Sequence, residues 1–154
     1  MIGLLQRVSE ARVAIAGEPV AEIGLGLLVL VGVERADDRP QAQRLAQRLL
    51  AYRVFPDREG RMNRNVVEAG GEILLVPQFT LAADTDSGNR PGFSRAAEPE
   101  LGARLFDYLL SCFAARGIQV PHGHFGADMQ VSLVNDGPVT FWLRVPPQAV
   151  RCGE

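Results

Sequence analysis

The chain has 154 residues, in which 18 acidic side chains oppose 16 basic ones, so the net charge is −2 and the pI is near 5.7. All basic residues are arginine, which excludes a lysine Schiff base, a phosphate-binding-loop lysine and a lysine general base. The mild acidity argues against nucleic-acid binding through a broad basic surface, but it allows a few arginines to hold one RNA end. We expect one domain over residues 1–145 and a loose tail over residues 146–154.

The first third of the sequence predicts four strands and a helix. Strands are expected at residues 4–8, 11–16, 20–23 and 27–33, with turns at residues 17–19 and 24–26. The fourth strand is continuously apolar, as in a strand buried on both faces. Asp37 and Asp38 precede Arg39-Pro40, which predicts a helix start with acids near its positive end. The apolar face of this helix contains Ala42, Leu45, Leu49 and Tyr52.

The remaining two thirds predict three longer strands and a second helix. A short extended segment at residues 53–55 meets a turn at 56–60, and a strand follows at 73–79. After a polar loop at 84–95, a helix begins at Pro99 and ends at Gly117. Its apolar stripe comprises Leu101, Leu105, Tyr108, Leu109, Cys112 and Phe113. Strands at 128–134 and 140–145 flank the turn sequence Asn135-Asp136-Gly137-Pro138. The pattern predicts a strand-rich α+β domain with two helices.

Several polar groups are candidates for chemistry, but each has a simpler structural explanation. His122 and His124 are two residues apart, yet zinc needs three or four protein ligands, so a solvated loop is favoured and no metal is expected. Asp84 and Asp86 could form a carboxylate pair, although turn hydrogen bonds explain both side chains adequately.

The two cysteines form no recognisable motif. Cys112 lies in the apolar helical stripe, which favours a buried thiol. Cys152 lies in the polar tail and could be a reactive surface thiol, although no neighbouring group would lower its pKa. The N-terminal segment is interrupted by charges, and the longest apolar run, residues 25–33, is too short to cross a bilayer. We therefore expect a soluble cytoplasmic protein.

Two segments are less fully explained by structure alone. In residues 75–80, a buried strand ends in Gln78, Phe79 and Thr80 just before a loop, where backbone N–H groups and a hydroxyl can meet a ligand. Ordinary strand termination is the favoured explanation when this segment is taken alone. Residues 135–140 contain a Gly-Pro turn, which is commonly structural. Taken by themselves, these patterns lead no further than an α+β domain.

Together, however, these segments resemble the D-aminoacyl-tRNA deacylase family. The resemblance runs from Met1 to Val145 and includes the opening residues 1–8 and the central loop sequences at residues 82–84 and 88–94. The most specific part extends from Phe125 through Leu143 and contains the family motif Asn-x-Gly-Pro-x-Thr intact. The resemblance implies a strand-rich α/β roll, with a barrel-like sheet and two packed helices, formed by a single deacylase domain.

The resemblance also implies a function. Members hydrolyse the ester that joins a D-amino acid, or glycine, to the end of a tRNA, without cofactor or metal. They are homodimers with active sites at the interface. Gly137-Pro138 would be a cis dipeptide that reaches into the partner's pocket and rejects L-aminoacyl groups, so selectivity would come from rejection rather than attraction. The tRNA would be held at its aminoacylated end rather than along its whole backbone.

Site residues follow from the same resemblance. Arg7 matches the family arginine that orients the Gly-Pro carbonyls, which favours the D-specific branch over a related branch that clears mischarged L-amino acids. The expected catalytic residues are Gln78, Phe79 and Thr80. The expected groups for substrate binding and L-rejection are Arg7, Met129, Asn135, Gly137, Pro138 and Thr140. Backbone N–H groups around Phe79 would hold the oxyanion while the terminal ribose 2′-hydroxyl helps to activate water.

The sequence departs from the family at one position. The motif Ser-Gln-x-Thr is present as Pro77-Gln78-Phe79-Thr80, so both the hydroxyl and the N–H of the serine are missing. A nucleophilic serine mechanism is therefore excluded. Two alternatives stay open, namely a non-catalytic relative that binds a tRNA end or other nucleic acid, and an L-aminoacyl-tRNA editing deacylase. Whether Arg64, Arg90 or Arg95 contacts phosphate also stays open, because surface ion pairs explain them equally well.

Overall fold

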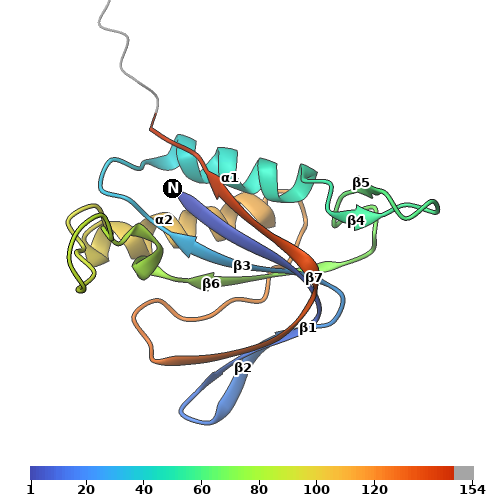
Figure 1. The fold of residues 1–154 in the computed structure, drawn as a ribbon, viewed down its shortest axis with the longest axis horizontal. Helices are drawn as coiled ribbons and strands as arrows, with labels where there is room; N and C mark the ends of the chain where they lie inside the picture. The colour runs from blue at the N-terminus through green and yellow to red at the C-terminus, as the bar shows by residue number, and fades with distance from the viewer. Residues whose placement is uncertain (148–154) are drawn as a thin grey trace, which may run out of the picture.

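The structure, a computed structural model, describes residues 1–147 and consists of a curled mixed sheet with two helices packed on one face (Figure 1). In the sheet, β1 pairs with β3 and β2 along one edge and with β7 along the other, and β3 pairs in turn with β6. Its strands are β1 (Ile2–Ile15), β2 (Glu18–Ile23), β3 (Gly26–Gly32), β6 (Glu72–Pro77) and β7 (Met129–Arg144). The helices are α1 (Arg39–Ala51) and α2 (Pro99–Ala114). The predicted strand-rich α+β roll with two packed helices is confirmed.

The central strand β1 corrects the prediction of two separate strands at residues 4–8 and 11–16. The exposed residues Ser9 and Glu10 interrupt the apolar pattern but not the backbone ladder. One edge of β1 pairs with β7 over its whole length, from Ile2–Arg144 to Ile15–Met129. The other edge pairs first with β3 and then with β2. Strand β7 spans the predicted break, where Glu10 pairs with Val134, and keeps the backbone of β1 extended.

Strands β3 and β6 run parallel and form the apolar centre of the sheet. The continuous apolar run of β3 is buried on both faces, as predicted. Gly26 begins this pairing opposite Glu72, and a Cβ at position 26 would overlap the main-chain carbonyl of Glu72. Glycine is therefore required where the two backbones approach most closely.

Strand β6 ends earlier than the predicted strand at residues 73–79. The Gln78 N–H still donates to the Val31 oxygen at 2.7 Å, but the chain then turns into the single 3₁₀ turn η1 (Phe79–Ala82). On the outer edge of β6, Leu75 exchanges hydrogen bonds with Pro121 and Gly123. The N–H groups of successive strand residues point to opposite edges, so position 77 faces the same outer edge as position 75. The N–H that Pro77 lacks would therefore point away from β3. Proline is tolerated there because the ladder to β3 stays complete.

Strand β7 corrects the prediction of two strands separated by a turn. Both halves pair with β1, but Val8 lies opposite Asn135 while Gln6 lies opposite Thr140. Residues 136–139 therefore bulge out of the ladder opposite Arg7. The turn sequence is used to bend one continuous strand rather than to reverse it.

The two helices begin as the sequence predicts. Asp38 caps α1 in a capping box with Gln41, and Pro99 opens α2. Asp37 takes no part in capping. Its carboxylate accepts hydrogen bonds from the Met1 amino group at 2.5 Å and from the Glu34 N–H at 2.7 Å. Within residues 1–147, no helix is both long and apolar enough to cross a membrane.

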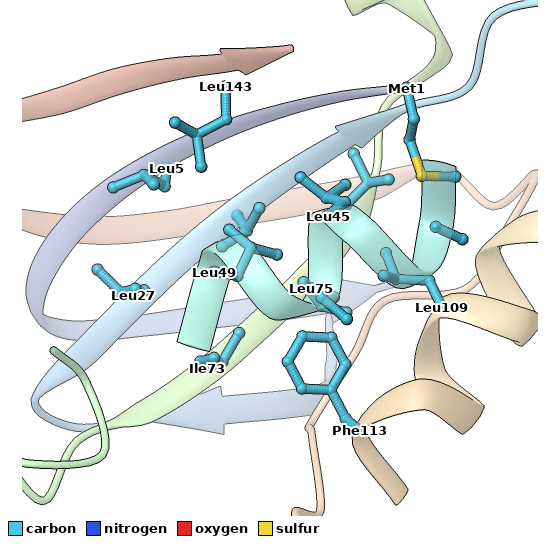
Figure 2. Packing of buried hydrophobic residues seen from close by; sticks show 14 of the residues in the cluster. Met1, Leu5, Leu27, Leu45, Leu49, Ile73, Leu75, Leu109, Phe113 and Leu143 are labelled. Carbon is cyan, nitrogen blue, oxygen red and sulfur yellow. The ribbon is translucent and has the colours of Figure 1, made fainter. Parts of the chain in front are cut away.

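Apolar side chains fill both faces of the sheet. The larger cluster lies between sheet and helices and includes Leu5, Leu27, Leu45, Leu49 and Phe113 (Figure 2). A second cluster lines the concave face of the curl and comprises Val8, Ala11, Val13, Ile23, Leu28, Leu74 and Val76. Alternation along β3 sends Leu27 into one cluster and Leu28 into the other.

The sequence patterns miss one small element. A hairpin of β4 (Phe55–Pro56) and β5 (Met62–Arg64) projects beyond one end of α1 (Figure 1). The turn at residues 56–60 is predicted, but the three residues of β5, all exposed, give no alternating strand pattern. Cys112 is buried, as predicted, and its burial raises the pKa of the thiol. Cys152 and most of the predicted tail lie outside the described residues.

Candidate active site

The guanidinium of Arg7 holds the bulge of β7 to the rest of the fold. Arg7 Nε donates to the main-chain oxygen of Asp136 at 3.0 Å and lies 3.0 Å from the Asp136 carboxylate. Arg7 Nη1 donates to the Val54 oxygen at 2.7 Å. The side chain is only 13% exposed, so these charge-assisted bonds form in a partly dehydrated setting and gain strength. The Arg7 side chain thus links β7 to the residue that precedes the β4–β5 hairpin through hydrogen bonds.

Asn135 closes the same bulge from the other side. Its Nδ2 donates to the main-chain oxygens of Arg7 at 2.9 Å and Val139 at 3.2 Å. Its Oδ1 covers Gly137, where an added Cβ would lie 2.5 Å away. The Gly137–Pro138 peptide bond is cis, and both residues are exposed. The motif asparagine and glycine therefore fit each other sterically, with the dipeptide presented at the surface.

Thr140 ends the bulge and re-enters the ladder. Its Oγ1 accepts a hydrogen bond from Gln6 Nε2 at 3.2 Å, across the pair that β1 and β7 form there. Of the six predicted substrate-binding residues, Gly137 and Pro138 lie in the bulge, Asn135 and Thr140 flank it, and Arg7 lies opposite it on β1. Met129, the sixth, lies at the far end of β7.

The predicted catalytic residues gather at the end of β6. Gln78 Nε2 donates to Thr80 Oγ1 at 2.6 Å, so the two side chains form one unit. Gln78 precedes η1 without a side-chain cap. Among residues 1–147, no protein acceptor takes the N–H of Phe79 or of Thr80. Phe79 and Thr80 are both exposed, so these two donors are open to a ligand.

A cavity of about 440 Å³ adjoins this turn. Its walls come from the end of β6, the start of α2 and the segment that enters β7, and they include Pro77, Gln78, Phe79, Phe125 and Met129. The lining is more apolar than polar, as expected for a site that admits an amino-acid side chain. Pro77 is buried in this wall.

The loop at residues 84–95 contacts the cavity wall through Phe93. Phe93 packs against Phe79, with ring centroids 5.1 Å apart, and both rings are exposed. The Asp86 N–H donates to Asp84 Oδ1 at 3.1 Å, as the turn interpretation predicts. Both carboxylates also pair with Arg95, at 3.6 Å for Asp84 and 2.7 Å for Asp86. Asp86 and Asp84 raise the pKa of the Arg95 guanidinium.

The two groups of predicted residues lie apart within one chain. Pro77 pairs with Val31, and Val31 pairs with Gly3, so the catalytic turn lies level with Gly3 on β1. The bulge lies opposite Arg7, roughly 13 Å further along β1 at about 3.3 Å per residue, on the other edge of that strand. Gly137 and Pro138 do not line the cavity, whereas Met129 does because the sheet curls. One chain therefore carries the predicted residues in two separate groups. We call Gln78, Phe79 and Thr80 the catalytic half-site, and we call Arg7, Asn135, Gly137, Pro138 and Thr140 the binding half-site.

The paired histidines do not add to either half-site. His122 and His124 lie with ring centroids 6.3 Å apart, and His122 Nδ1 is 2.8 Å from the Gly123 oxygen. Across the described part of the chain, no three His, Cys, Asp or Glu side chains cluster closely enough to hold a metal ion.

Comparison with known proteins identifies the family of this chain. Residues 4–144 match the family described as D-Tyr-tRNA(Tyr) deacylase. The chain belongs to this family. A D-aminoacyl-tRNA deacylase of Alkalilimnicola ehrlichii is 60% identical over 149 residues, which cover 97% of this chain and 99% of the relative. One from Escherichia coli is 56% identical over 145 residues, covering 94% of this chain and all of the relative.

Two solved structures share the fold of this chain. A c-Myc DNA unwinding element binding protein superposes with a TM-score of 0.89 at 36% identity, over 95% of this chain and 99% of that one. A structure described as a probable eukaryotic D-amino acid tRNA deacylase superposes with a TM-score of 0.81 at 17% identity, over 92% of this chain and 97% of that one. The second likeness shows that the deacylase fold is kept at low identity.

Several residues of the half-sites escape prediction from the sequence. Val54 contributes only a main-chain oxygen, which no side-chain pattern reveals. Gln6 lies in an ordinary strand. Phe125 lies within the segment that most resembles the deacylase family, and this was the available signal for its place in the cavity wall.

Proposed function

We propose that this deacylase hydrolyses D-aminoacyl-tRNA as a homodimer that rejects L-aminoacyl groups at a composite site. The chain hydrolyses the ester between the amino acid and the terminal ribose, releasing free amino acid and tRNA. The observation that carries the proposal is the division of site residues into two half-sites on one chain. A second copy would bring the bulge of one chain to the cavity of the other.

The catalytic half-site supplies main-chain donors rather than a nucleophile. A water oxygen attacks the ester carbonyl, and the N–H groups of Phe79 and Thr80 receive the oxyanion that develops. The ribose 2′-hydroxyl helps to activate that water. The bond from the carbonyl carbon to the ribose O3′ then breaks, and O3′ takes a proton. The Gln78–Thr80 pair positions the substrate, and Pro77 fits the scheme because both donors follow it.

The binding half-site supplies selectivity. Arg7 and Asn135 fix the bulge through main-chain oxygens, which leaves Gly137 and Pro138 exposed as a rigid wall. An L side chain would collide with such a wall, whereas its mirror image points away from it. Glycine has no side chain to collide, so glycyl-tRNA also enters.

The first test compares D-Tyr-tRNA with L-Tyr-tRNA as substrates. We expect release of D-Tyr at nanomolar enzyme and no loss of L-Tyr-tRNA. Failure to release D-Tyr at micromolar enzyme, with tRNA binding retained, would support a non-catalytic nucleic-acid-binding protein instead. Hydrolysis of L-Tyr-tRNA alone would support an L-specific editing enzyme.

The role of the Phe79 N–H is tested with a matched pair of variants. Phe79→Ala removes the ring but keeps the N–H, whereas Phe79→Pro removes the N–H as well. Loss of one oxyanion donor lowers kcat by about 10²–10³-fold. We therefore expect Phe79→Pro to fall that far below Phe79→Ala. Equal kcat values for the two variants would refute the oxyanion role.

A mixed dimer tests whether the wall acts on the partner's cavity. One chain is wild type, and the other combines Phe79→Pro with Arg7→Gln, so it has an inactive cavity and a loosened wall. If the wall acts in trans, the intact cavity faces the loosened wall and gains activity on L-Tyr-tRNA. If the wall acts within one chain, the mixed dimer still rejects L-Tyr-tRNA. Light scattering gives the mass, expected at twice 16.7 kDa.

A further inference from the structure

Residues 53–64, which include the β4–β5 hairpin, form an exposed basic segment that we call the arginine arm. In Figure 1 the hairpin projects away from the sheet and helices. Its sequence has four arginines against two carboxylates, although the whole chain carries a net charge of −2. The four arginines, all exposed, are Arg53, Arg58, Arg61 and Arg64. The arm thus concentrates positive charge on an otherwise acidic protein.

The arginines of the arm are not neutralised. Within residues 1–147, ion pairs form at Arg7, Arg35, Arg95 and Arg144, and none forms in the arm. Arg64 donates only to the main-chain oxygen of Glu68.

Two of the acids near these arginines, Asp57 and Glu68, accept hydrogen bonds from neighbouring N–H groups. The Asp57 carboxylate accepts from Asn63 Nδ2 and from the N–H groups of Arg61 and Glu59, and these hydrogen bonds lower the pKa of Asp57. The Glu68 carboxylate accepts from the Asn65 N–H at 2.8 Å. Asp57 shapes the turn of the arm instead of pairing with its arginines. The guanidinium groups therefore stay available for an external anion.

The arm is tied directly to the binding half-site. Arg7 donates to the oxygen of Val54 in the arm and to the oxygen of Asp136 in the bulge. The base of the arm therefore lies beside Gly137 and Pro138. In the proposed dimer this bulge faces the aminoacylated ribose, so the arm of the same chain would flank the nucleic acid that leads to that ribose.

We infer that the arginine arm binds backbone phosphates of the tRNA near its aminoacylated end, an inference that rests on the proposed function. Guanidinium groups bind phosphate oxygens in bidentate fashion, and their release of counterions makes such binding depend on salt. The partly exposed Met62, 47% accessible, offers an apolar surface to a ribose or base between these contacts. Arg95 does not serve this role, because two carboxylates already hold it.

The test is the double variant Arg58→Gln/Arg61→Gln, matched by Arg44→Gln/Arg104→Gln on exposed helix positions. Loss of two phosphate contacts should reduce the slope of log affinity against log salt by about 1.4 and weaken tRNA binding about tenfold. We expect kcat/KM for D-Tyr-tRNA to fall by a similar factor. Hydrolysis of the short ester 3′-O-(D-tyrosyl)adenosine should stay within about twofold, because it has no phosphate backbone. The helix control should match the wild type in every assay.

Binding of uncharged tRNA separates this inference from the proposed function. If the wild type hydrolyses none of the substrates but the arm variant binds uncharged tRNA more weakly than the wild type, the proposed activity is refuted and phosphate binding by the arm is supported. An arm variant that binds uncharged tRNA as tightly as the wild type, with the same salt slope, would overturn the arm. An equal loss on the short ester would overturn it too, because the arm would then act on the cavity. Equal melting temperatures show that the variants are folded.

Discussion

Asn135 Nδ2 donates a hydrogen bond to the main-chain oxygen of Arg7 at 2.9 Å. This bond joins β7 beside its bulge to the residue of β1 whose side chain holds that bulge. The same nitrogen reaches the Val139 oxygen at 3.2 Å. Replacing Asn135 with alanine leaves both oxygens without this donor. We expect a loss of about 1–2 kcal/mol in unfolding free energy, measured by urea denaturation.

The functional effect of this variant should be larger on selectivity than on rate. With the wall loosened, discrimination between D-Tyr-tRNA and L-Tyr-tRNA should fall by about tenfold or more, since 1.4 kcal/mol corresponds to a factor of ten. Asn135→Asp keeps the shape but presents a carboxylate to two carbonyl oxygens, so it should be at least as damaging. Unchanged discrimination in both variants would show that Asn135 does not hold the wall.

Gly102 sets the depth of the cavity by making room for Phe125. A Cβ at position 102 would lie 2.8 Å from Phe125 Cζ, so Gly102→Ala must displace that ring. Because Phe125 lines the cavity, the displaced ring should obstruct a large aminoacyl group more than a small one. We expect the kcat/KM ratio of D-Tyr-tRNA to glycyl-tRNA to fall about tenfold, as for a pocket contact of 1–3 kcal/mol.

A matched glycine provides the control. Gly24 has open space where a Cβ would stand, so Gly24→Ala should leave the substrate ratio unchanged. An unchanged ratio in Gly102→Ala would mean that Phe125 moves away from the cavity instead of into it.

Pro77 allows the serine of the family motif to be restored. The backbone nitrogen of residue 77 faces the outer edge of β6, and the hydrogen bond from the Gln78 N–H to Val31 does not involve it. Pro77→Ser should therefore fold normally. If main-chain donors carry the chemistry, kcat for D-Tyr-tRNA should change by no more than about threefold, less than 1 kcal/mol in barrier. A gain of a hundredfold would instead assign a catalytic part to the serine hydroxyl. Single-turnover kinetics measures this step directly.

The fold was largely predictable because its apolar patterns are local and periodic. The continuous run of β3 and the start of α1 at Arg39-Pro40 arise from neighbouring residues, and both appear as predicted. Strand β7 was not predictable in this way. Strand β7 stays continuous through residues 136–139 because β1 pairs with it both before and after the bulge. Pairing between distant segments overrode a local turn signal.

The candidate site residues were named by resemblance, because the physics of the sequence patterns alone did not single them out. Gln78 and Thr80 give no distinctive pattern, and their hydrogen bond becomes visible only in the folded turn. The role of Arg7 depends on carbonyl oxygens at positions 54 and 136, which any residue type could supply. The separation of the two half-sites follows from strand register. A motif match cannot reveal that separation.

Glu34 makes part of the stability depend on acid pH. Burial raises the pKa of its carboxyl, but hydrogen bonds and charge from Arg144 and from the Met1 amino group outweigh this and lower it overall. A carboxyl with a lowered pKa in the folded state stabilises the fold above its unfolded value, 4.5, and this contribution disappears as the pH falls through the folded pKa.

Urea denaturation between pH 3 and pH 7 of the wild type and of Glu34→Gln tests this dependence. The wild type should be the more stable protein at pH 7, because glutamine cannot pair with Arg144, which holds Glu34 Oε1 at 2.8 Å. The difference should shrink steadily below pH 4.5, where the wild-type carboxyl takes up its proton. A stability difference that is constant across this pH range would show that the pKa of Glu34 is the same in the folded and unfolded states.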